Sequence, residues 1–273
     1  MGAIGAFTFV LHSHLPYARL AGRWPHGEEW IHEAASETYI PLLQTLYDLK
    51  EEGVPFHITI GITPILAEQL ADSTVLDHFD QYLDDKIKAA RQDMEYFAEK
   101  PRPVQMAVDV VKLVDDLTTD EAEQDLAEAA DEAADLAELA TETIMETVPD
   151  TSNPHLLYLA EWYKNWYENI KQAFDVRFNR DMIGAFRQLQ DEGFIEITTS
   201  AATHGYLPLL SRDSSIVGQL KAGVQSYKRL FGRQPTGIWL PECAYRPAYI
   251  TDSGRKRPGL ETWLAKSGLK VFF

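Results

Sequence analysis

Residues 237–245 read Gly-Ile-Trp-Leu-Pro-Glu-Cys-Ala-Tyr, a short apolar run that leads directly into one carboxylate. A run of this length that follows a turn signal, here Arg-Gln-Pro-Thr at 233–236, is typical of a buried strand. Pro241 has no N–H to donate to a neighbouring strand, so we expect the strand to stop there and Glu242 to lie at its C-terminal end. Parallel α/β sheets and barrels carry their catalytic groups at that end.

The neighbours of Glu242 in the sequence are an indole, a thiol and a phenol, from Trp239, Cys243 and Tyr245. A carboxylate in such company is expected to be poorly solvated, which makes it either costly or useful. The alternative is an ordinary strand-end glutamate in a salt bridge. The stretch alone favours neither interpretation, and the rest of the chain must decide.

The composition is that of a globular protein, with 45% hydrophobic and 25% charged residues in a chain of 273. This length suits one large α/β domain or two smaller ones. The chain has no run near the roughly 18 apolar residues of a membrane helix, and the N-terminus does not resemble a signal peptide. The single cysteine, Cys243, excludes an intrachain disulfide and a zinc site built from several cysteines. We therefore expect a cytoplasmic protein with no membrane partner.

The net charge of −17 is concentrated in one segment. Residues 109–150 hold 15 acidic residues and one lysine, which leaves 27 acidic and 24 basic residues elsewhere. The absence of a basic stripe argues against nucleic acid as a partner. We expect an acidic helical insertion over 102–152, lying on the surface rather than binding a cation, because its apolar residues recur at helical spacing: Ala122, Leu126, Ala129, Ala133, Leu136, Leu139 and Ala140.

Strand-like and helix-like segments alternate along the rest of the chain, which predicts a mainly parallel sheet. The expected strands are 4–11, 54–62, 194–200, the run after 236, and 268–273; the expected helices are 28–50, 74–99, 155–190 with a break near Asn179 and Arg180, 213–231 and 259–267. The chain stops inside the last strand. This suggests the N-terminal part of a longer protein, or a truncated product.

Four strand ends carry polar side chains beside a proline: His12 and His14, then Thr63, His204 and Glu242. In a parallel sheet or barrel these ends share one face, so the side chains would line one pocket. A lone strand-end histidine is more often structural than catalytic. The combination of three histidines and a glutamate on one predicted face favours a functional site.

Aromatic side chains near these ends suit a carbohydrate, because sugar rings stack their C–H faces on aromatic planes. Trp24, Tyr206, Trp239 and Tyr245 are candidates. Glycoside chemistry needs two carboxylates, and in the retaining mechanism one of them is a nucleophile. Glu242 fits that role, and no comparable second carboxylate follows a strand in this chain.

Four motifs carry a resemblance to a known family: HSHLPY at 12–17, GITPIL at 61–66, ATHGYLPLL at 202–210 and GIWLPECAYRP at 237–247. Together they resemble glycoside hydrolase family 57, most closely its 1,4-α-glucan branching enzymes, over nearly the whole chain except 102–152. The resemblance implies a (β/α)7 barrel and a retaining transfer of an α-1,4-glucan segment to a 6-hydroxyl, without metal or organic cofactor. It assigns Glu242 as the nucleophile. Our candidate substrate-binding residues are His12, His14, Trp24, His204, Tyr206, Trp239, Cys243 and Tyr245.

The chain departs from the family in one respect. The family's acid/base aspartate lies on a later strand, beyond the point where Phe273 falls. We therefore expect residues 1–273 to form a C-terminally incomplete barrel domain, whose partner is the missing C-terminal part of the same protein. Taken alone, such a chain is predicted to be inactive, with an open sheet edge.

Two rival interpretations stay open. A metal-dependent carbohydrate deacetylase or α-mannosidase would use His12 and His14 as ligands, with His204 or Glu242 as a third. Against it, no aspartate accompanies the first-strand motif. The other rival is a catalytically inactive fragment that binds glucan.

Overall fold

The computed structural model describes residues 5, 7–22, 26–98 and 151–273. The chain divides into two compact units, one formed by Met1–Asp85 with Tyr167–Phe273 and the other by Lys86–Trp166. The first unit holds the strands and every predicted site residue that the structure describes. Trp24 and nearly all of the predicted acidic insertion lie outside the described residues.

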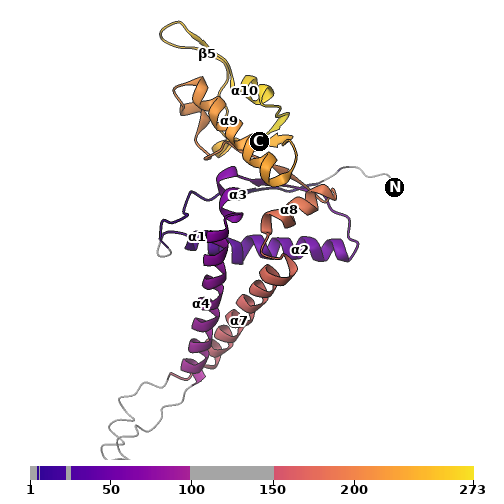
Figure 1. Cartoon of the computed structure of the whole chain (residues 1–273), viewed down its shortest axis with the longest axis vertical. Helices are drawn as coiled ribbons and strands as arrows, with labels where there is room; N and C mark the ends of the chain where they lie inside the picture. Colours follow the sequence, from indigo (N-terminus) through magenta and orange to yellow (C-terminus); the bar gives the residue numbers. More distant parts are fainter. Residues whose placement is uncertain (1–4, 6, 23–25, 99–150) are drawn as a thin grey trace, which may run out of the picture. The chain divides into compact units, whose positions relative to one another are not determined.

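Strands and helices alternate through the first unit in the order that the sequence predicts (Figure 1). They are β1 (Val10–Ser13), α1 (Glu29–Ala34), α2 (Ile40–Glu51), β2 (Ile58–Ile62), α3 (Pro64–Leu70), α8 (Met182–Asp191), β3 (Ile195–Thr198), α9 (Asp213–Phe231), β4 (Gly237–Ile238), α10 (Leu260–Lys266) and β7 (Val271–Phe272). Short elements connect them: the π-helical turns η1 (Ala35–Tyr39) and η2 (Ala173–Arg177), the 3-10 turns η3 (Leu207–Leu209) and η4 (Pro241–Cys243), and the hairpin of β5 (Tyr249–Ile250) and β6 (Lys256–Arg257).

All the strands outside the hairpin run parallel. β1, β2 and β3 form one sheet, in which His12 pairs with Gly61 and Gly61 pairs with Thr198. A parallel bridge between Thr199 and Ile238 links β3 to β4, and β4 pairs with β7. The order β1-β2-β3-β4-β7 therefore brings the C-terminal ends of the strands to one side. The predicted α/β fold with parallel strands is confirmed.

The strands are shorter than predicted, and β1 begins only at Val10, so that His12 lies inside it. The predicted helix 28–50 is present but is interrupted by η1. Pro41 stands at the start of α2 and has no N–H, so the preceding turn cannot keep the regular α-helical hydrogen-bond pattern. The hairpin of β5 and β6 lies outside the strands and helices that the sequence predicts.

The break predicted near Asn179 and Arg180 is confirmed. Both residues have left-handed backbone angles, with φ of 48° and 59°, which a continuous helix does not allow. Asp181 then caps α8, because its carboxylate accepts a hydrogen bond from the N–H of Gly184 at 2.7 Å.

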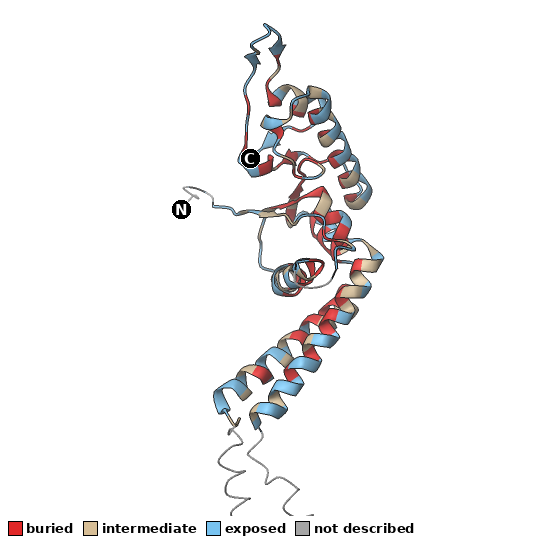
Figure 2. Ribbon diagram, turned by 90° about the vertical axis from the view of Figure 1, so that its left-hand side faces the viewer, coloured by how far each residue is buried: buried red, intermediate tan, exposed pale blue. Residues whose placement is uncertain are grey.

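Helix α9 packs against α3, α8 and α10. The helices of the first unit are buried along one side and exposed along the other (Figure 2). The core beneath α9 and α10 is formed by Ala201, Leu207, Ile216, Leu220, Val224, Ile238, Leu240, Leu260, Leu264 and Leu269. It includes Ile238 of β4 and lies directly under the segments that follow β3 and β4.

Within the described residues, the second unit contains parts of two helices, α4 (Ser73–Ala98) and α7 (Pro154–Gln172), whose remaining residues belong to the first unit. Within it, Ala90 and Ala160 are buried, and the N–H of Asn153 donates to the carbonyl of Phe97 at 3.0 Å. No helix in the described ranges is long and apolar enough to cross a membrane.

Two glycines of α9 provide a matched test of how closely this helix approaches the strands. A Cβ on Gly223 would lie 2.5 Å from the carbonyl oxygen of Ser200, whereas a Cβ on Gly218 would meet open space. We expect Gly223→Ala to lower the free energy of unfolding by about 1–3 kcal/mol, because backbone must move. Gly218→Ala should raise it by about 0.5–1 kcal/mol, because alanine favours the helix.

Urea unfolding of both variants measures these changes. Equal effects of the two substitutions would show that α9 does not press on the end of β3.

Candidate active site

A stack of aromatic rings occupies the C-terminal side of the strands. The ring of His12 lies parallel to that of Trp239, with centroids 4.6 Å apart and 12° between the planes. His204 stacks on both first-strand histidines, at 5.1 Å from His12 and 4.1 Å from His14. Side chains from β1, from the segment after β3 and from the segment after β4 thus form one cluster, although β1 precedes the other two segments by more than 180 residues in the chain.

Glu242 joins this cluster from η4. Its Oε1 lies 3.8 Å from Nε2 of His204. Glu242, Cys243 and His204 all have left-handed backbone angles, with φ of 57°, 53° and 54°. Such angles are costly for residues other than glycine and cluster at functional sites, where the surrounding fold holds them in place.

Hydroxyl groups at the strand ends hold two of the histidine rings. Nδ1 of His204 lies 2.9 Å from Oγ of Ser200, and the same Oγ donates to the carbonyl of Trp239 at 2.8 Å. Nδ1 of His14 lies 3.2 Å from Oγ1 of Thr63, the buried residue that precedes α3. Ring orientation in the cluster is therefore set by side chains from the neighbouring strands.

Burial keeps the histidines neutral. Desolvation, with the nearby His14, lowers the pKa of His12 to about 4. Desolvation, with His14 and His12, also lowers the pKa of His204 to about 4. The pKa of His14 is lowered by burial as well, although Glu242 opposes the shift. At neutral pH these rings serve as hydrogen-bonding groups rather than as cations.

Gly61 of β2 lies beside His12 of β1, with which it pairs. A Cβ at this position would lie 3.1 Å from Nδ1 of His12 and 3.2 Å from Oγ1 of Thr198. Both of these polar atoms are buried, and neither has a hydrogen-bond partner within the described residues. Because Gly61 has no side chain, no Cβ crowds Nδ1 of His12 and Oγ1 of Thr198. Both atoms are able to hydrogen-bond to a hydroxyl group.

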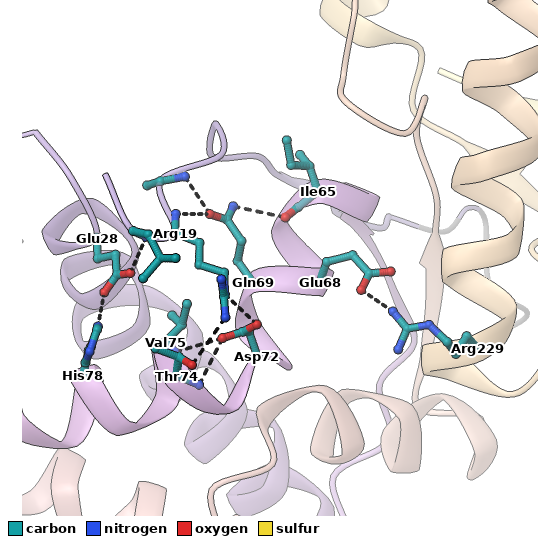
Figure 3. Close-up of polar contacts among 12 residues, drawn as sticks. Arg19, Glu28, Ile65, Glu68, Gln69, Asp72, Thr74, Val75, His78 and Arg229 are labelled. Atoms are coloured by element: carbon teal, nitrogen blue, oxygen red, sulfur yellow. Dashed lines mark hydrogen bonds and ion pairs between the residues drawn. The ribbon is translucent and has the colours of Figure 1, made fainter. Parts of the chain in front are cut away.

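Gln69 anchors the segment that follows His14 (Figure 3). Its side-chain oxygen accepts hydrogen bonds from the N–H groups of Ala18 at 2.7 Å and Arg19 at 3.1 Å. Its side-chain nitrogen donates to the carbonyls of Pro16 at 3.0 Å and Ile65 at 3.1 Å. One buried amide on α3 thus fixes the backbone at the end of the HSHLPY motif and just past it.

A buried carboxylate fixes the next part of the same loop (Figure 3). Glu28 accepts a hydrogen bond from the N–H of Leu20 at 2.7 Å and pairs with His78 at 2.5 Å. Burial alone would raise the pKa of Glu28, but these two partners hold it below its usual value. Arg19 also pairs with Asp72 at 2.7 Å, so that helices α3 and α4 and the start of α1 all hold the loop.

The structure therefore brings together five of the predicted site residues: His12, His14, His204, Trp239 and Glu242. The other predicted residues that the structure describes do not share these contacts. Tyr245 turns toward Glu261, to which its hydroxyl donates at 2.7 Å, and its ring stacks on Phe272. Tyr206 and Cys243 are exposed in the adjoining segments.

The prediction that Glu242 is poorly solvated is wrong. Its side chain is 70% exposed, because the left-handed turn of η4 directs it away from the core. Cys243 is exposed as well, and Tyr245 is held by Glu261. The burial lies instead in its partner His204, whose side chain is only 4% exposed.

Sequence reasoning missed Ser200, Thr198, Gly61 and Gln69. A signal existed for the first two, because the third predicted strand ends in three consecutive hydroxyl residues four positions before His204. No local signal marks Gly61 or Gln69, whose roles depend on register and on contacts across the fold.

The metal-dependent alternative is not supported by the ring geometry. Stacked imidazoles present their faces to one another, so the nitrogens of His12, His14 and His204 do not converge on one point. Among the residues that the structure describes, no three His, Cys, Asp or Glu side chains form a group that could hold an ion.

The structure thus defines a parallel α/β protein with a glutamate and histidines at its strand ends. Comparison with known proteins identifies its family. The model of glycosyl hydrolase family 57 matches residues 8–273, and the chain belongs to that family.

Three relatives show where the chain lies within the family. A 1,4-α-glucan branching enzyme of Thermococcus kodakarensis is 40% identical over 98% of this chain and 32% of that protein. A probable 1,4-α-glucan branching enzyme of Mycobacterium tuberculosis is 29% identical over 91% of this chain and 39% of that protein. The crystal structure of the family 57 branching enzyme of Pyrococcus horikoshii superposes with a TM-score of 0.72 at 36% identity, covering 97% of this chain and 41% of that one. The chain thus spans about a third of the length of the first of these relatives.

The neutral histidines predict how stability depends on pH. Between pH 6.5 and 4, the unfolded chain binds protons at His12 and His204 that the folded protein does not bind. The free energy of unfolding should therefore fall as the pH is lowered through this window. His204 alone should contribute about 1 kcal/mol per pH unit.

Urea unfolding at several pH values checks this. His204→Asn should flatten the slope, and the control His155→Asn, at an exposed position, should leave it unchanged. An unchanged slope in His204→Asn would contradict the neutral assignment.

Proposed function

We propose that this chain forms part of a 1,4-α-glucan branching enzyme, in which Glu242 is the nucleophile of a retaining transfer. The observation that carries the proposal is the placement of Glu242 on a strained turn, 3.8 Å from a buried histidine. The relatives named above as branching enzymes supply the substrate class. The fold expected for the whole domain is the (β/α)7 barrel of the family.

In this mechanism a carboxylate oxygen of Glu242 attacks the anomeric carbon of the donor sugar, and the bond to the leaving 4-oxygen breaks. The product is a covalent glycosyl-enzyme with inverted configuration. The 6-hydroxyl of an acceptor glucan then attacks the same carbon, and the Glu242 carboxylate leaves. Two inversions give an α-1,6 branch, with the α configuration retained.

The ring cluster is suited to hold the donor sugar. His12, His14 and His204 offer neutral nitrogens to hydroxyl groups, and Trp239, whose ring stacks on His12 and Phe273, supports the ring of His12. Trp24, Tyr206 and Tyr245 are proposed as further substrate contacts because aromatic rings stack on sugars, and Cys243 is proposed because it lies beside Glu242 in the sequence.

A retaining transfer needs a second carboxyl group that protonates the leaving oxygen and later deprotonates the acceptor. The resemblance assigns this role to an aspartate on a strand later than any in this chain. We propose that a further segment of polypeptide supplies it.

Glu242→Gln tests the proposal, because an amide keeps the shape of the side chain but is a very poor nucleophile. In the full-length protein we expect the rate of glucan transfer to fall by at least about 10³-fold. Branching of amylose is followed as a loss of iodine absorbance without new reducing ends. The exposed Glu37→Gln is the matched control and should stay active.

Full activity in a folded Glu242→Gln variant would remove the nucleophile assignment. New reducing ends in the wild-type reaction would indicate hydrolysis instead of branching. Glucan binding without any turnover would identify a binding protein.

A further inference from the structure

The hydroxyl of Ser200 lies between the carbonyl of Trp239 and the ring of His204. Because the hydroxyl has a single proton, the group to which it donates determines which ring nitrogen of His204 is protonated. We propose that Ser200 fixes His204 as the Nδ1–H tautomer, so that the buried Nε2 atom of His204 accepts a hydrogen bond from a hydroxyl group of the donor sugar. The identity of the sugar rests on the proposed function. The tautomer does not.

The assignment follows from counting protons. Oγ of Ser200 lies 2.8 Å from the carbonyl oxygen of Trp239, which can only accept a hydrogen bond, so Ser200 must donate there. Having one proton, Ser200 cannot also donate to Nδ1 of His204, which lies 2.9 Å away. The Nδ1 atom must therefore carry the proton and donate it to Ser200. In a neutral ring the other nitrogen, Nε2, is then an acceptor.

This leaves two acceptors facing each other at the candidate site. Nε2 of His204 and Oε1 of Glu242 are 3.8 Å apart, too far for a hydrogen bond, and neither atom has a proton to share when the ring is neutral. The side chain of His204 is only 4% exposed, so its lone pair has little access to bulk water. A hydroxyl group placed within reach of both atoms would satisfy the buried nitrogen.

The opposite tautomer would do something different. An N–H at Nε2 would face Oε1 of Glu242 at 3.8 Å and attract the carboxylate electrostatically, and Nε2 could then no longer accept a hydrogen bond from a substrate hydroxyl. Ser200 prevents this because its oxygen accepts a hydrogen bond from Nδ1–H, the ring nitrogen that does not face Glu242. It is therefore a positioning residue, which acts on the carboxylate and on the substrate only through His204.

The chemistry of the proposed reaction selects the hydroxyl group. If Glu242 bonds to the anomeric carbon, the 2-hydroxyl on the adjacent carbon lies closest to the carboxylate. Hydrogen bonds to this hydroxyl strengthen in the transition state of retaining glycoside transfer. We assign Nε2 of His204 as the acceptor for the 2-hydroxyl of the donor sugar.

The position of Ser200 is itself well fixed. The residue is 1% exposed and follows Thr199, which bridges β3 to β4. Its carbonyl oxygen packs against Gly223 of α9, where even a methyl group would clash. The hydroxyl therefore cannot drift away from Trp239 and His204 without moving the strand end.

Nitrogen NMR of the protein labelled with 15N-histidine reads the tautomer directly and needs no substrate. The signals of His204 are assigned by their loss in His204→Asn. We expect a protonated Nδ1 and an unprotonated Nε2 in the wild type and in Ser200→Thr, which keeps the hydroxyl. In Ser200→Ala the Nε2–H form should become dominant. A wild-type ring protonated at Nε2, or a tautomer that Ser200→Ala leaves unchanged, would overturn the proposal.

The second measurement compares α-maltosyl fluoride with its analogue that lacks the reacting sugar's 2-hydroxyl, in the full-length enzyme. Ser200→Ala should lower kcat/KM for the ordinary donor by roughly tenfold, the effect of one lost hydrogen bond, and should change the rate on the 2-deoxy donor much less. Ser200→Thr should restore the rate. Ser226→Ala, at a half-buried position whose hydroxyl donates to Glu68, is the control and should behave as wild type.

Equal losses on both donors would overturn the role of the 2-hydroxyl. If no variant, including the wild type, uses either donor, the proposed function fails, while the NMR result still decides the tautomer. The two failures are therefore distinguishable.

Discussion

The candidate site depends on a short set of hydrogen bonds between the end of β3 and the end of β4. The N–H of Thr199 donates to the carbonyl of Gly237 at 3.1 Å, and the N–H of Trp239 donates to the carbonyl of Thr199 at 2.8 Å. The hydroxyl of Ser200 adds a third hydrogen bond, which it donates to the carbonyl of Trp239. Each bond contributes only about 1 kcal/mol. Their importance is positional, because they fix the segment of β3 that leads to His204 beside the segment of β4 that leads to Glu242.

Beside these hydrogen bonds, the structure places a buried cluster of histidine rings next to the exposed carboxylate of Glu242. Burial keeps His12 and His204 neutral. The ring of His12 stacks on both His204 and Trp239. Glu242 reaches solvent from a left-handed turn whose strain, like that at His204, is of order 1–3 kcal/mol. The apolar core under α9 and α10 holds the strand ends rigid enough to keep this strain. A carboxylate that reaches solvent beside neutral hydrogen-bond acceptors is suited to a polyhydroxylated ligand.

Much of this arrangement could be predicted from sequence, for physical reasons. A proline after an apolar run ends a strand, and parallel strands end on one side, which is enough to place His12, His204 and Glu242 together. Solvent exposure of Glu242 could not be predicted, since it depends on the backbone turn of η4 rather than on its neighbours in the chain. The role of Gln69 could not be predicted either, because three of its four hydrogen bonds join residues about 50 positions apart.

The central claim is that Glu242 forms a covalent bond to the donor sugar while neutral side chains hold that sugar. Trapping the intermediate tests this most directly. The full-length protein is incubated with 2-deoxy-2-fluoro-α-maltosyl fluoride, which slows release of the glycosyl group, and its peptides are analysed by mass spectrometry. The account predicts one added glycosyl group on the peptide that contains Glu242, located on that side chain by fragmentation and missing in Glu242→Gln. A stable label on any other residue, with Glu242 unmodified, would contradict it.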